Sequence, residues 1–246
     1  MDRLIYVAMS GAKHTMQQQA TVSNNLANLT TTGYRAQNIA FRATPVFGEG
    51  MPTRAFVLDS TPGADFRPGA IQHTDRELDV AVEGRGWIAV QAADGSEAYT
   101  RAGSLEINGN GVLQTRSGLN IMGDGGPISI PPDTRVTIGR DGTISTVPQG
   151  NRPNQAASVG RIKLVNPDEA QLVRGADGLF RLAAGGAAPD DAQVKLIGGA
   201  LEGSNVNAVD AMVSMITLAR QFEMQIKMLQ NAESNERQAN QILAAR

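Results

Sequence analysis

The chain of 246 residues contains no cysteine. This absence excludes disulfide bonds, thiolate metal ligands and cysteine nucleophiles together. Aromatic residues make up only 4% of the chain, with a single tryptophan, so few side chains could stack on bases or sugars. A net charge of −2 and a pI of about 5.7 provide no electric field that would gather nucleic acid or anionic lipid. We therefore expect neither a nucleic-acid partner nor a membrane-binding surface.

Long hydrophobic runs are also missing. The longest early apolar run, Leu4–Met9, is far shorter than the roughly 18 residues that a membrane-spanning helix needs. It also lacks the longer apolar region and the small-residue cleavage site of a secretory signal. We expect no direct membrane insertion and no cleaved signal peptide, so that any export from the cytoplasm would use another route.

Proline is absent from both ends of the chain. All 11 prolines lie between Pro45 and Pro189, and 25 of the 27 glycines lie between Gly48 and Gly203. Because proline and glycine interrupt helices, the distribution predicts helical ends and a middle of turns and strands. We predict three parts: residues 1–34 with 203–246 as a terminal helical domain, 35–77 as an extended irregular connector, and 78–202 as a β-rich outer domain.

The first segment predicts a helix over about residues 2–28, with one apolar face at three- and four-residue steps. Lys13 is the only formally charged residue between Arg3 and Arg35. A helix with a nearly uncharged polar face is typical of one surrounded by other protein. Gly11 costs about 1 kcal/mol relative to alanine in a helix, and we expect it to permit the close approach of another backbone.

The middle predicts antiparallel strands. Asp79–Glu83 alternates between polar and apolar residues, and strong turn dipeptides such as Asp94-Gly95 and Asp141-Gly142 separate further short apolar runs. Turns spaced by roughly 8–15 residues are typical of an antiparallel sandwich or an open barrel.

The last segment predicts a long helix that begins after Asn207, a suitable N-cap, with Asp210 near its positive end. Its apolar residues follow a 3-4-3-4-3 spacing that predicts a coiled-coil seam of Met212, Met215, Ala219, Phe222, Ile226 and Leu229. The seam could pair with another subunit, or the two terminal helices could form an intramolecular hairpin. The predicted fold class is thus α+β: long terminal helices as a coiled-coil core, with an inserted antiparallel all-β domain.

Residues for catalysis or metal binding are sparse. His14 and His73 lie in different segments, without cysteine or suitably spaced carboxylates. The Asp-Gly and Asn-Gly pairs lack the alternating carboxylates that calcium needs, and hairpin turns explain them better. We predict that the chain is not an enzyme and has no catalytic, cofactor or metal site.

One run of residues is specific enough to indicate a family. Ser23-Asn24-Asn25-Leu26-Ala27-Asn28, followed by Thr31-Thr32-Gly33-Tyr34-Arg35, resembles the N-terminal motif of bacterial flagellar axial proteins. Leu201–Asn207, leading into the last helix, resembles their C-terminal motif. Glu83–Ile88 and Tyr99–Gly103 resemble their β-domain, so the resemblance covers essentially the whole chain. The opening residues 1–12 are similar to those of proximal-rod members.

The resemblance implies a structural subunit of the proximal rod in the flagellar basal body. Such a subunit is made in the cytoplasm, is exported by the flagellar type III apparatus, and polymerises through its terminal helices into the drive-shaft tube. Its partners would be inner proximal-rod subunits, the distal rod protein and the export apparatus. Alternatives are a distal-rod subunit or, in another class, a periplasmic cell-wall-binding module that uses Trp87 and Tyr99.

The residues predicted to mediate assembly lie on the two terminal helices and the motif between the first helix and the connector. They are Leu4, Ile5, Met9, Ala12, Met16, Ser23, Asn24, Asn25, Leu26, Asn28, Gly33, Tyr34, Met212, Met215, Ala219, Phe222, Ile226 and Leu229.

Overall fold

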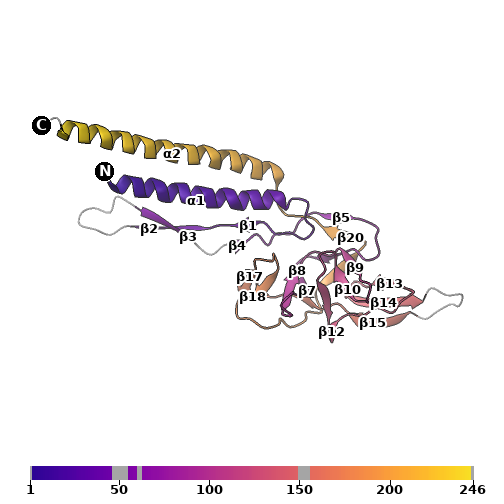
Figure 1. Cartoon of the computed structure of the whole chain (residues 1–246). Helices are drawn as coiled ribbons and strands as arrows, with labels where there is room; N and C mark the ends of the chain where they lie inside the picture. Colours follow the sequence, from indigo (N-terminus) through magenta and orange to yellow (C-terminus); the bar gives the residue numbers. More distant parts are fainter. Residues whose placement is uncertain (1, 46–54, 60–62, 149–155, 245–246) are drawn as a thin grey trace. The chain divides into compact units, whose positions relative to one another are not determined.

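The computed structural model describes residues 2–45, 55–59, 63–148 and 156–244 (Figure 1). The chain divides into two compact units. Unit 1 consists of Met1–Asn28, Gln37–Asp65 and Val206–Arg246, and unit 2 consists of Leu29–Ala36 and Phe66–Asn205. The three-part division expected from the sequence stays a prediction, because contacts alone do not establish which parts fold independently.

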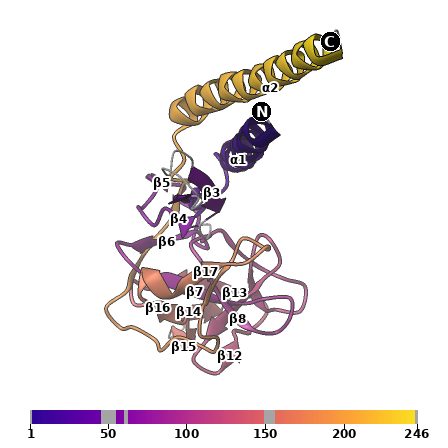
Figure 2. The same ribbon diagram turned by 90° about the vertical axis from the view of Figure 1, so that its left-hand side faces the viewer.

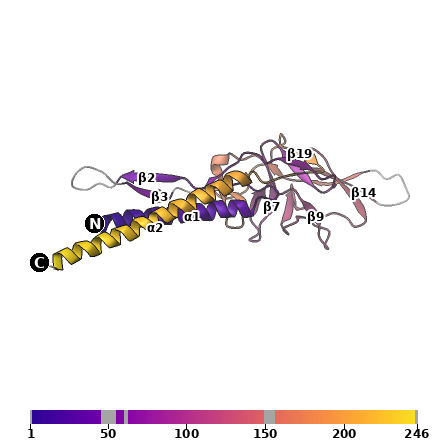
Figure 3. The same cartoon turned by 90° about the horizontal axis from the view of Figure 1, so that it is seen from above.

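Two helices dominate unit 1. Helix α1 spans Asp2–Ala27 and α2 spans Ala208–Ala244. They lie side by side and run in opposite directions, as Figures 1 and 3 show. The predicted N-cap of α2 is confirmed, since Asn207 Oδ1 accepts a hydrogen bond of 3.0 Å from the Val209 N–H. Neither helix is long and apolar enough, over its described part, to cross a membrane.

Two short strand pairs complete unit 1. Strand β1 (Gln37–Asn38) pairs with β4 (Gly63–Ala64), and β2 (Phe41–Pro45) pairs with β3 (Ala55–Asp59). Both β1 and β3 contact α1. Each pair is small, and two-stranded pairs are marginally stable without packing against another element.

Unit 2 is built on an antiparallel sheet with the strand order β17-β18-β8-β7-β11-β10-β9. Two further strands join it, β12 beside β11 and β16 beside β7. The strands of this sheet are β7 (Trp87–Gln91), β8 (Glu97–Thr100), β9 (Leu105–Ile107), β10 (Leu113–Thr115), β11 (Asn120–Gly123), β12 (Gly126–Pro127), β16 (Leu164–Val165), β17 (Leu172–Arg174) and β18 (Phe180–Leu182). A 3-10 helix, Glu169–Gln171, precedes β17.

Three smaller antiparallel sheets surround this one. They are β13-β14-β15 (Thr134–Ile138, Thr143–Pro148 and Ala157–Arg161), β19 with β6 (Lys195–Gly198 and Val80–Glu83), and β20 with β5 (Ala200–Glu202 and Ile71–His73). Figure 2 shows β5, β6, β13, β14 and β15 in a second view. The predicted turn residues Gly95 and Gly142 have φ of 81° and 84°, a conformation that glycine adopts at little cost.

The core of unit 2 collects apolar side chains from several of these sheets. Ile88, Leu105, Leu113, Ile144 and Leu196 are fully buried in it. The pattern of inward apolar residues explains why short strands, marginal on their own, form one stable unit.

The predicted fold class is wrong in its helical core. Long terminal helices around a β-rich insert are present, but the described residues hold only two α-helices besides twenty strands, and they do not show a coiled-coil core. Met212, predicted in the seam, is 53% exposed, while its neighbour Ala211 is 9% exposed and Leu218 is 8% exposed. The other five seam residues are half-buried, and the buried positions Ala211 and Leu218 each lie one residue before a seam position. Strands from residues 37–64 also belong to the helical unit.

Candidate assembly site

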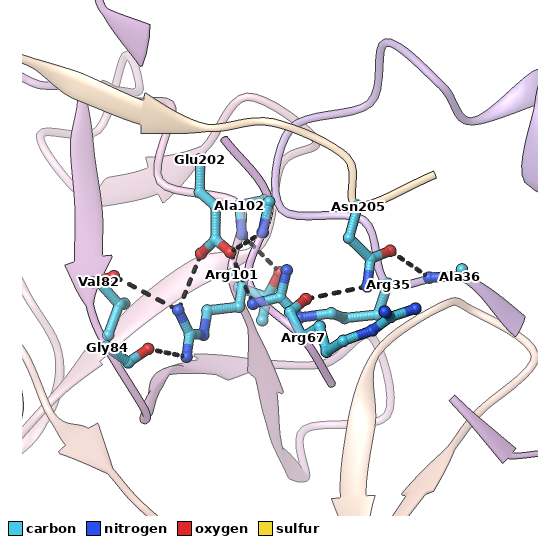
Figure 4. Close-up of polar contacts among 11 residues, drawn as sticks. Arg35, Ala36, Arg67, Val82, Gly84, Arg101, Ala102, Glu202 and Asn205 are labelled. Carbon is cyan, nitrogen blue, oxygen red and sulfur yellow. Dashed lines mark hydrogen bonds and ion pairs between the residues drawn. The ribbon is translucent and has the colours of Figure 1, made fainter. Parts of the chain in front are cut away.

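Three separate stretches of chain meet at one place in unit 2. Residues 33–36 and 202–205 belong to the two sequence motifs, and residues 67–70 lie between them. The Gly33 N–H donates to the Glu202 carbonyl oxygen at 2.8 Å, and the Gly203 N–H donates to the Ala70 carbonyl oxygen at 2.8 Å. We call this place, with residues 101–103 beneath it, the junction (Figure 4).

The Glu202 side chain is the centre of the junction. Its two oxygens lie 2.7 Å from Arg35 Nη2 and 2.8 Å from Arg101 Nη1. The Gly69 N–H adds a hydrogen bond of 2.9 Å to Oε1. All three charged side chains are at most 4% exposed. Removing one member of such a buried group leaves an uncompensated charge, which is more costly than the pair is worth.

Two guanidinium groups share the single carboxylate of the junction, and further polar groups bind the guanidinium of Arg101. Arg101 donates to the carbonyl oxygens of Val82 and Gly84, as Figure 4 shows. Trp87 is 4% exposed, and the guanidinium carbons of Arg35 and Arg101 lie 5.9 and 5.4 Å from the centre of its ring. Burial lowers the pKa of Arg101, and the charge of Glu202 opposes this shift.

Asn205 fixes the exit of the chain from unit 2. Its Oδ1 accepts from the Ala36 N–H at 2.7 Å, and its Nδ2 donates to the Arg67 carbonyl oxygen at 2.9 Å. One amide side chain therefore binds both other stretches. Ala36, Phe66 and Asn205, where the chain enters and leaves unit 2, are thus held near the junction.

Glycines allow the stretches to cross closely. A Cβ atom on Gly33 would overlap the backbone of Arg101 and Ala102, and one on Gly69 would overlap the Gly203 carbonyl oxygen. Gly33 also has φ of 68°, in the left-handed region that favours glycine. These crossings require glycine for reasons of space and, at Gly33, of conformation.

In unit 1, Asn25 and Asn28 carry the polar contacts of the first motif. Asn25 is 9% exposed, donates to the Gln37 carbonyl oxygen at 2.9 Å and accepts from the Gln37 N–H at 2.8 Å. The amide thus pairs with β1 as a neighbouring strand would. Asn28 Nδ2 donates to the carbonyl oxygen and to Oδ1 of Asn24, both at 2.9 Å, and closes the end of α1.

The two helices approach each other through small residues. Ala8, Ala12 and Thr15 are buried on α1. A Cβ atom on Gly11 would lie 3.1 Å from the amide carbon of Gln225 on α2. The close approach at Gly11 is present, but its neighbour is a side chain and not the backbone that we expected.

The helices leave large apolar side chains exposed. Nine of the twelve exposed large hydrophobic residues of the described chain lie on α1 and α2. They are Tyr6, Met9 and Met16 on α1, and Val209, Met212, Val213, Ile216, Met224 and Met228 on α2. A groove of about 520 Å³ also lies in unit 1, lined by uncharged residues of α1, of residues 37–39 and of α2, including Gln18, Asn38 and Val213.

The predicted assembly residues divide between the two units. Gly33 and Tyr34 lie at the junction, where Tyr34 is 6% exposed and faces the Arg174 guanidinium at 4.5 Å. All others lie on α1, α2 or, for Asn28, at the end of α1. Ala12 and Asn25 are buried; Ile5, Leu26, Asn28, Met215, Ala219, Phe222, Ile226 and Leu229 are half-buried; Met9, Met16, Ser23, Asn24 and Met212 are exposed. The side chain of Leu4 lies outside the described residues. Their role in assembly stays a prediction.

The sequence reasoning missed Arg35, Arg101, Glu202 and Asn205 as site residues. Each lies inside a segment that carried the resemblance, and Glu202 occupies an inward position of the alternating strand β20. A charged residue at an inward strand position is a signal of a buried partner, which could have drawn attention to it.

Within the described residues, no group of three or more His, Asp or Glu side chains could hold a metal ion. Trp87 and Tyr99 are 4% and 0% exposed. Neither of the two aromatic rings considered for a cell-wall-binding module therefore lies on the surface.

Three family models match the chain along its length. They are the flagella basal body rod protein family over residues 5–35, the D1 domain of the flagellar hook protein FlgE/F/G family over 81–146, and the C-terminal region of the flagellar basal body rod FlgEFG protein over 197–242. The first and last matches contain the two motifs that meet at the junction. The chain therefore belongs to the flagellar basal-body rod protein family, whose members are structural proteins and not enzymes.

Curated relatives of the chain are similar over its full length. It is 47% identical to the flagellar basal-body rod protein FlgF of Salmonella typhimurium and 48% identical to FlgF of Escherichia coli, in both cases over 99% of each chain. It is 32% identical to the rod protein FlgG of Agrobacterium fabrum, over 94% of this chain and 95% of the relative.

Proposed function

We propose that this chain is a subunit of the proximal rod, in the position that FlgF proteins take, rather than of the distal rod. The proposal rests on sequence identity. The chain is 47 and 48% identical to the FlgF proteins of Salmonella typhimurium and Escherichia coli over 99% of each chain, compared with 32% to the FlgG protein of Agrobacterium fabrum. The neighbours would be inner proximal-rod subunits on one side and the distal rod protein on the other. Delivery would use the flagellar type III apparatus, without cleavage of a signal.

The exposed apolar side chains of α1 and α2 support contacts with neighbouring subunits in unit 1. Met16 and Met224 are each 57% exposed, and large apolar groups left in water on one set of helices favour burial against another protein. The uncharged groove of unit 1 can accept side chains of a neighbour without the cost of burying a charge.

Photo-crosslinking in purified basal bodies tests the position. A crosslinkable residue replaces Met16 or Met224, and the products are identified by mass spectrometry. We expect inner proximal-rod subunits and the distal rod protein among the products. Products with distal rod subunits alone would refute the proximal position.

A charged substitution tests the apolar face itself. Met224→Asp should leave the helix content and thermal stability of the purified chain nearly unchanged, because the position is exposed. It should abolish swimming, since a charge would be buried against the neighbour. Asn110→Asp, which adds the same charge on an exposed turn of unit 2, is the control and should swim normally. Normal swimming of the Met224→Asp strain would contradict the assignment of this face.

A further inference from the structure

The last residues of unit 2 in the chain occupy central positions in it. Residues 195–205, here called the closing segment, comprise β19, β20 and the stretch through Asn205. Strand β19 pairs along four residues with β6, and Leu196 and Ala200 are both 0% exposed. Unit 2 therefore lacks a buried strand and part of its core until this segment is present.

The charged residues of the junction also follow a fixed order along the chain. Arg35 and Arg101 precede Glu202 in the chain, and Glu202 is the only carboxylate that forms an ion pair with either of them among the described residues. Before Glu202 arrives, two guanidinium groups would have to enter a site in which they are at most 4% exposed, without an anion. Leaving them in water, with the junction open, is the more favourable state.

The close backbone contacts at the junction indicate the same order of folding, with the closing segment last. Gly69 meets the Gly203 backbone, and Asn205 binds the backbone of both Ala36 and Arg67. The stretches 33–36 and 67–70 thus have a common partner only when residues 202–205 are in place. Three independent kinds of contact, strand pairing, ion pairing and backbone crossing, depend on the same eleven residues of chain.

We propose that the closing segment controls the folding of unit 2: the unit does not reach its folded state until residues 195–205 have joined it. A chain that is delivered from its N-terminus therefore keeps residues 29–194 open until the closing segment emerges. Helix α2 begins at Ala208, so the completion of unit 2 directly precedes the appearance of this helix. The proposal concerns the order of folding and does not depend on the position of the subunit in the rod.

Hydrogen exchange on the full chain tests whether the segment acts on the whole unit. Glu202→Gln keeps the shape of the side chain and removes its charge. We expect the amides of β7, β8 and β11 to lose protection together with those of β19, by about 100- to 1000-fold, because the unit opens as a whole. Glu83→Gln is the matched control, since its carboxylate is 48% exposed and forms a looser pair of 3.5 Å with Arg140. It should change protection little. Loss of protection confined to residues 195–205 and their partner strands would overturn the proposal.

A double variant keeps the test decisive if Glu202→Gln does not fold. Arg101→Gln with Glu202→Gln removes one positive charge along with the negative one. We expect it to recover protection in β7 and β8 relative to Glu202→Gln alone, by at least tenfold. Absence of any recovery would overturn the part of the argument that rests on unmatched charge.

The order of delivery is tested on ribosome-bound chains stalled with either residue 194 or residue 207 outside the ribosome. A protease should cleave within β7 and β8 in the first and leave them intact in the second. Equal protection in both would show that unit 2 folds without its closing segment.

Discussion

Substitution of Gly33 by alanine should be among the most destabilising single-methyl changes in unit 2. The position combines two demands: φ of 68°, and a Cβ that would overlap the backbone of Arg101 and Ala102. Three other glycines of unit 2 each show one of these demands without the other, or neither. Gly118 has φ of 84° with nothing within 4 Å, Gly69 meets the Gly203 backbone without a positive φ, and Gly109 has neither feature.

The expected changes in the free energy of unfolding follow from these two demands, backbone conformation and space for a Cβ atom. Gly109→Ala should be neutral or stabilising by up to about 1 kcal/mol, because alanine reduces the entropy of the unfolded chain. Gly118→Ala should cost about 1 kcal/mol, the left-handed conformation being worth roughly 1–2 kcal/mol against a residue with a Cβ. Gly69→Ala should cost about 1–3 kcal/mol, since backbone must move to make room. Gly33→Ala should cost about 2–5 kcal/mol as the sum, a large share of the roughly 5–15 kcal/mol that stabilises a typical domain.

Urea unfolding followed by Trp87 fluorescence provides the measurement. Trp87 is the only tryptophan and its ring lies within 6 Å of the guanidinium carbons of both Arg35 and Arg101, so its emission reports the junction directly. The midpoints should fall in the order Gly109→Ala, Gly118→Ala, Gly69→Ala, Gly33→Ala. If Gly33→Ala is no worse than Gly118→Ala, the crossing over Arg101 contributes nothing and the account of the junction is wrong.

Three further predictions concern other contacts. Burial raises the pKa of Tyr99 to about 12, whereas the tyrosine of the unfolded chain ionises near pH 10. The free energy of unfolding should therefore fall as the pH rises from about 10 to about 12. Thermal unfolding at several pH values should show this decrease in the natural chain and a smaller one in Tyr99→Phe. Asn25→Ala should cost about 1–3 kcal/mol in unit 1, because the Gln37 N–H and carbonyl lose their partners; faster exchange of the Gln37 amide would confirm it, and unchanged exchange would contradict it. Gly11→Ala should be neutral or stabilise α1 by up to about 1 kcal/mol, since the added methyl meets only the end of the flexible Gln225 side chain; a clear loss of helix stability by circular dichroism would show that Gln225 cannot move.

The sequence was sufficient for the elements whose signal is local. Helix α1 follows from its periodic apolar residues and ends near the expected position, and the Asn207 cap of α2 is confirmed. The turns at Gly95 and Gly142 follow from the dipeptides that precede β8 and β14. In each case the residues that determine the structure are within a few positions of one another.

The buried face of α2 was predicted only in part. The predicted seam residues Met215, Ala219, Phe222, Ile226 and Leu229 are half-buried, but Met212 is exposed and the most buried positions are Ala211, Leu218 and Ala232. Ala211 and Leu218 each lie one residue before a seam position. Which of two adjacent positions is buried more deeply depends on how the helices cross, which is a property of the pair and not of either sequence segment.

Asn25 and Glu202 show the other limit of sequence reasoning. Each was part of a motif, but the partners of Asn25 lie 12 residues away at Gln37, and Glu202 pairs with Arg101 across 101 residues. A side chain that satisfies a distant backbone or charge leaves no periodic trace in the sequence. Only its unusual burial, once the fold is known, identifies its role.

The two units differ in how much of their apolar surface they expose, and we expect them to have different roles. Unit 2 buries its large apolar residues in its own core and exposes only Ile71, Ile107 and Val173 among those described. Unit 1 leaves nine large apolar side chains of α1 and α2 exposed, among them Met16 and Met224. Substitutions in unit 2 should therefore change the stability of the isolated chain, whereas substitutions on the exposed face of α2 should spare stability and change assembly. Because these two outcomes are measured by different assays, a single panel of variants can distinguish a residue that holds the subunit together from one that joins it to its neighbours.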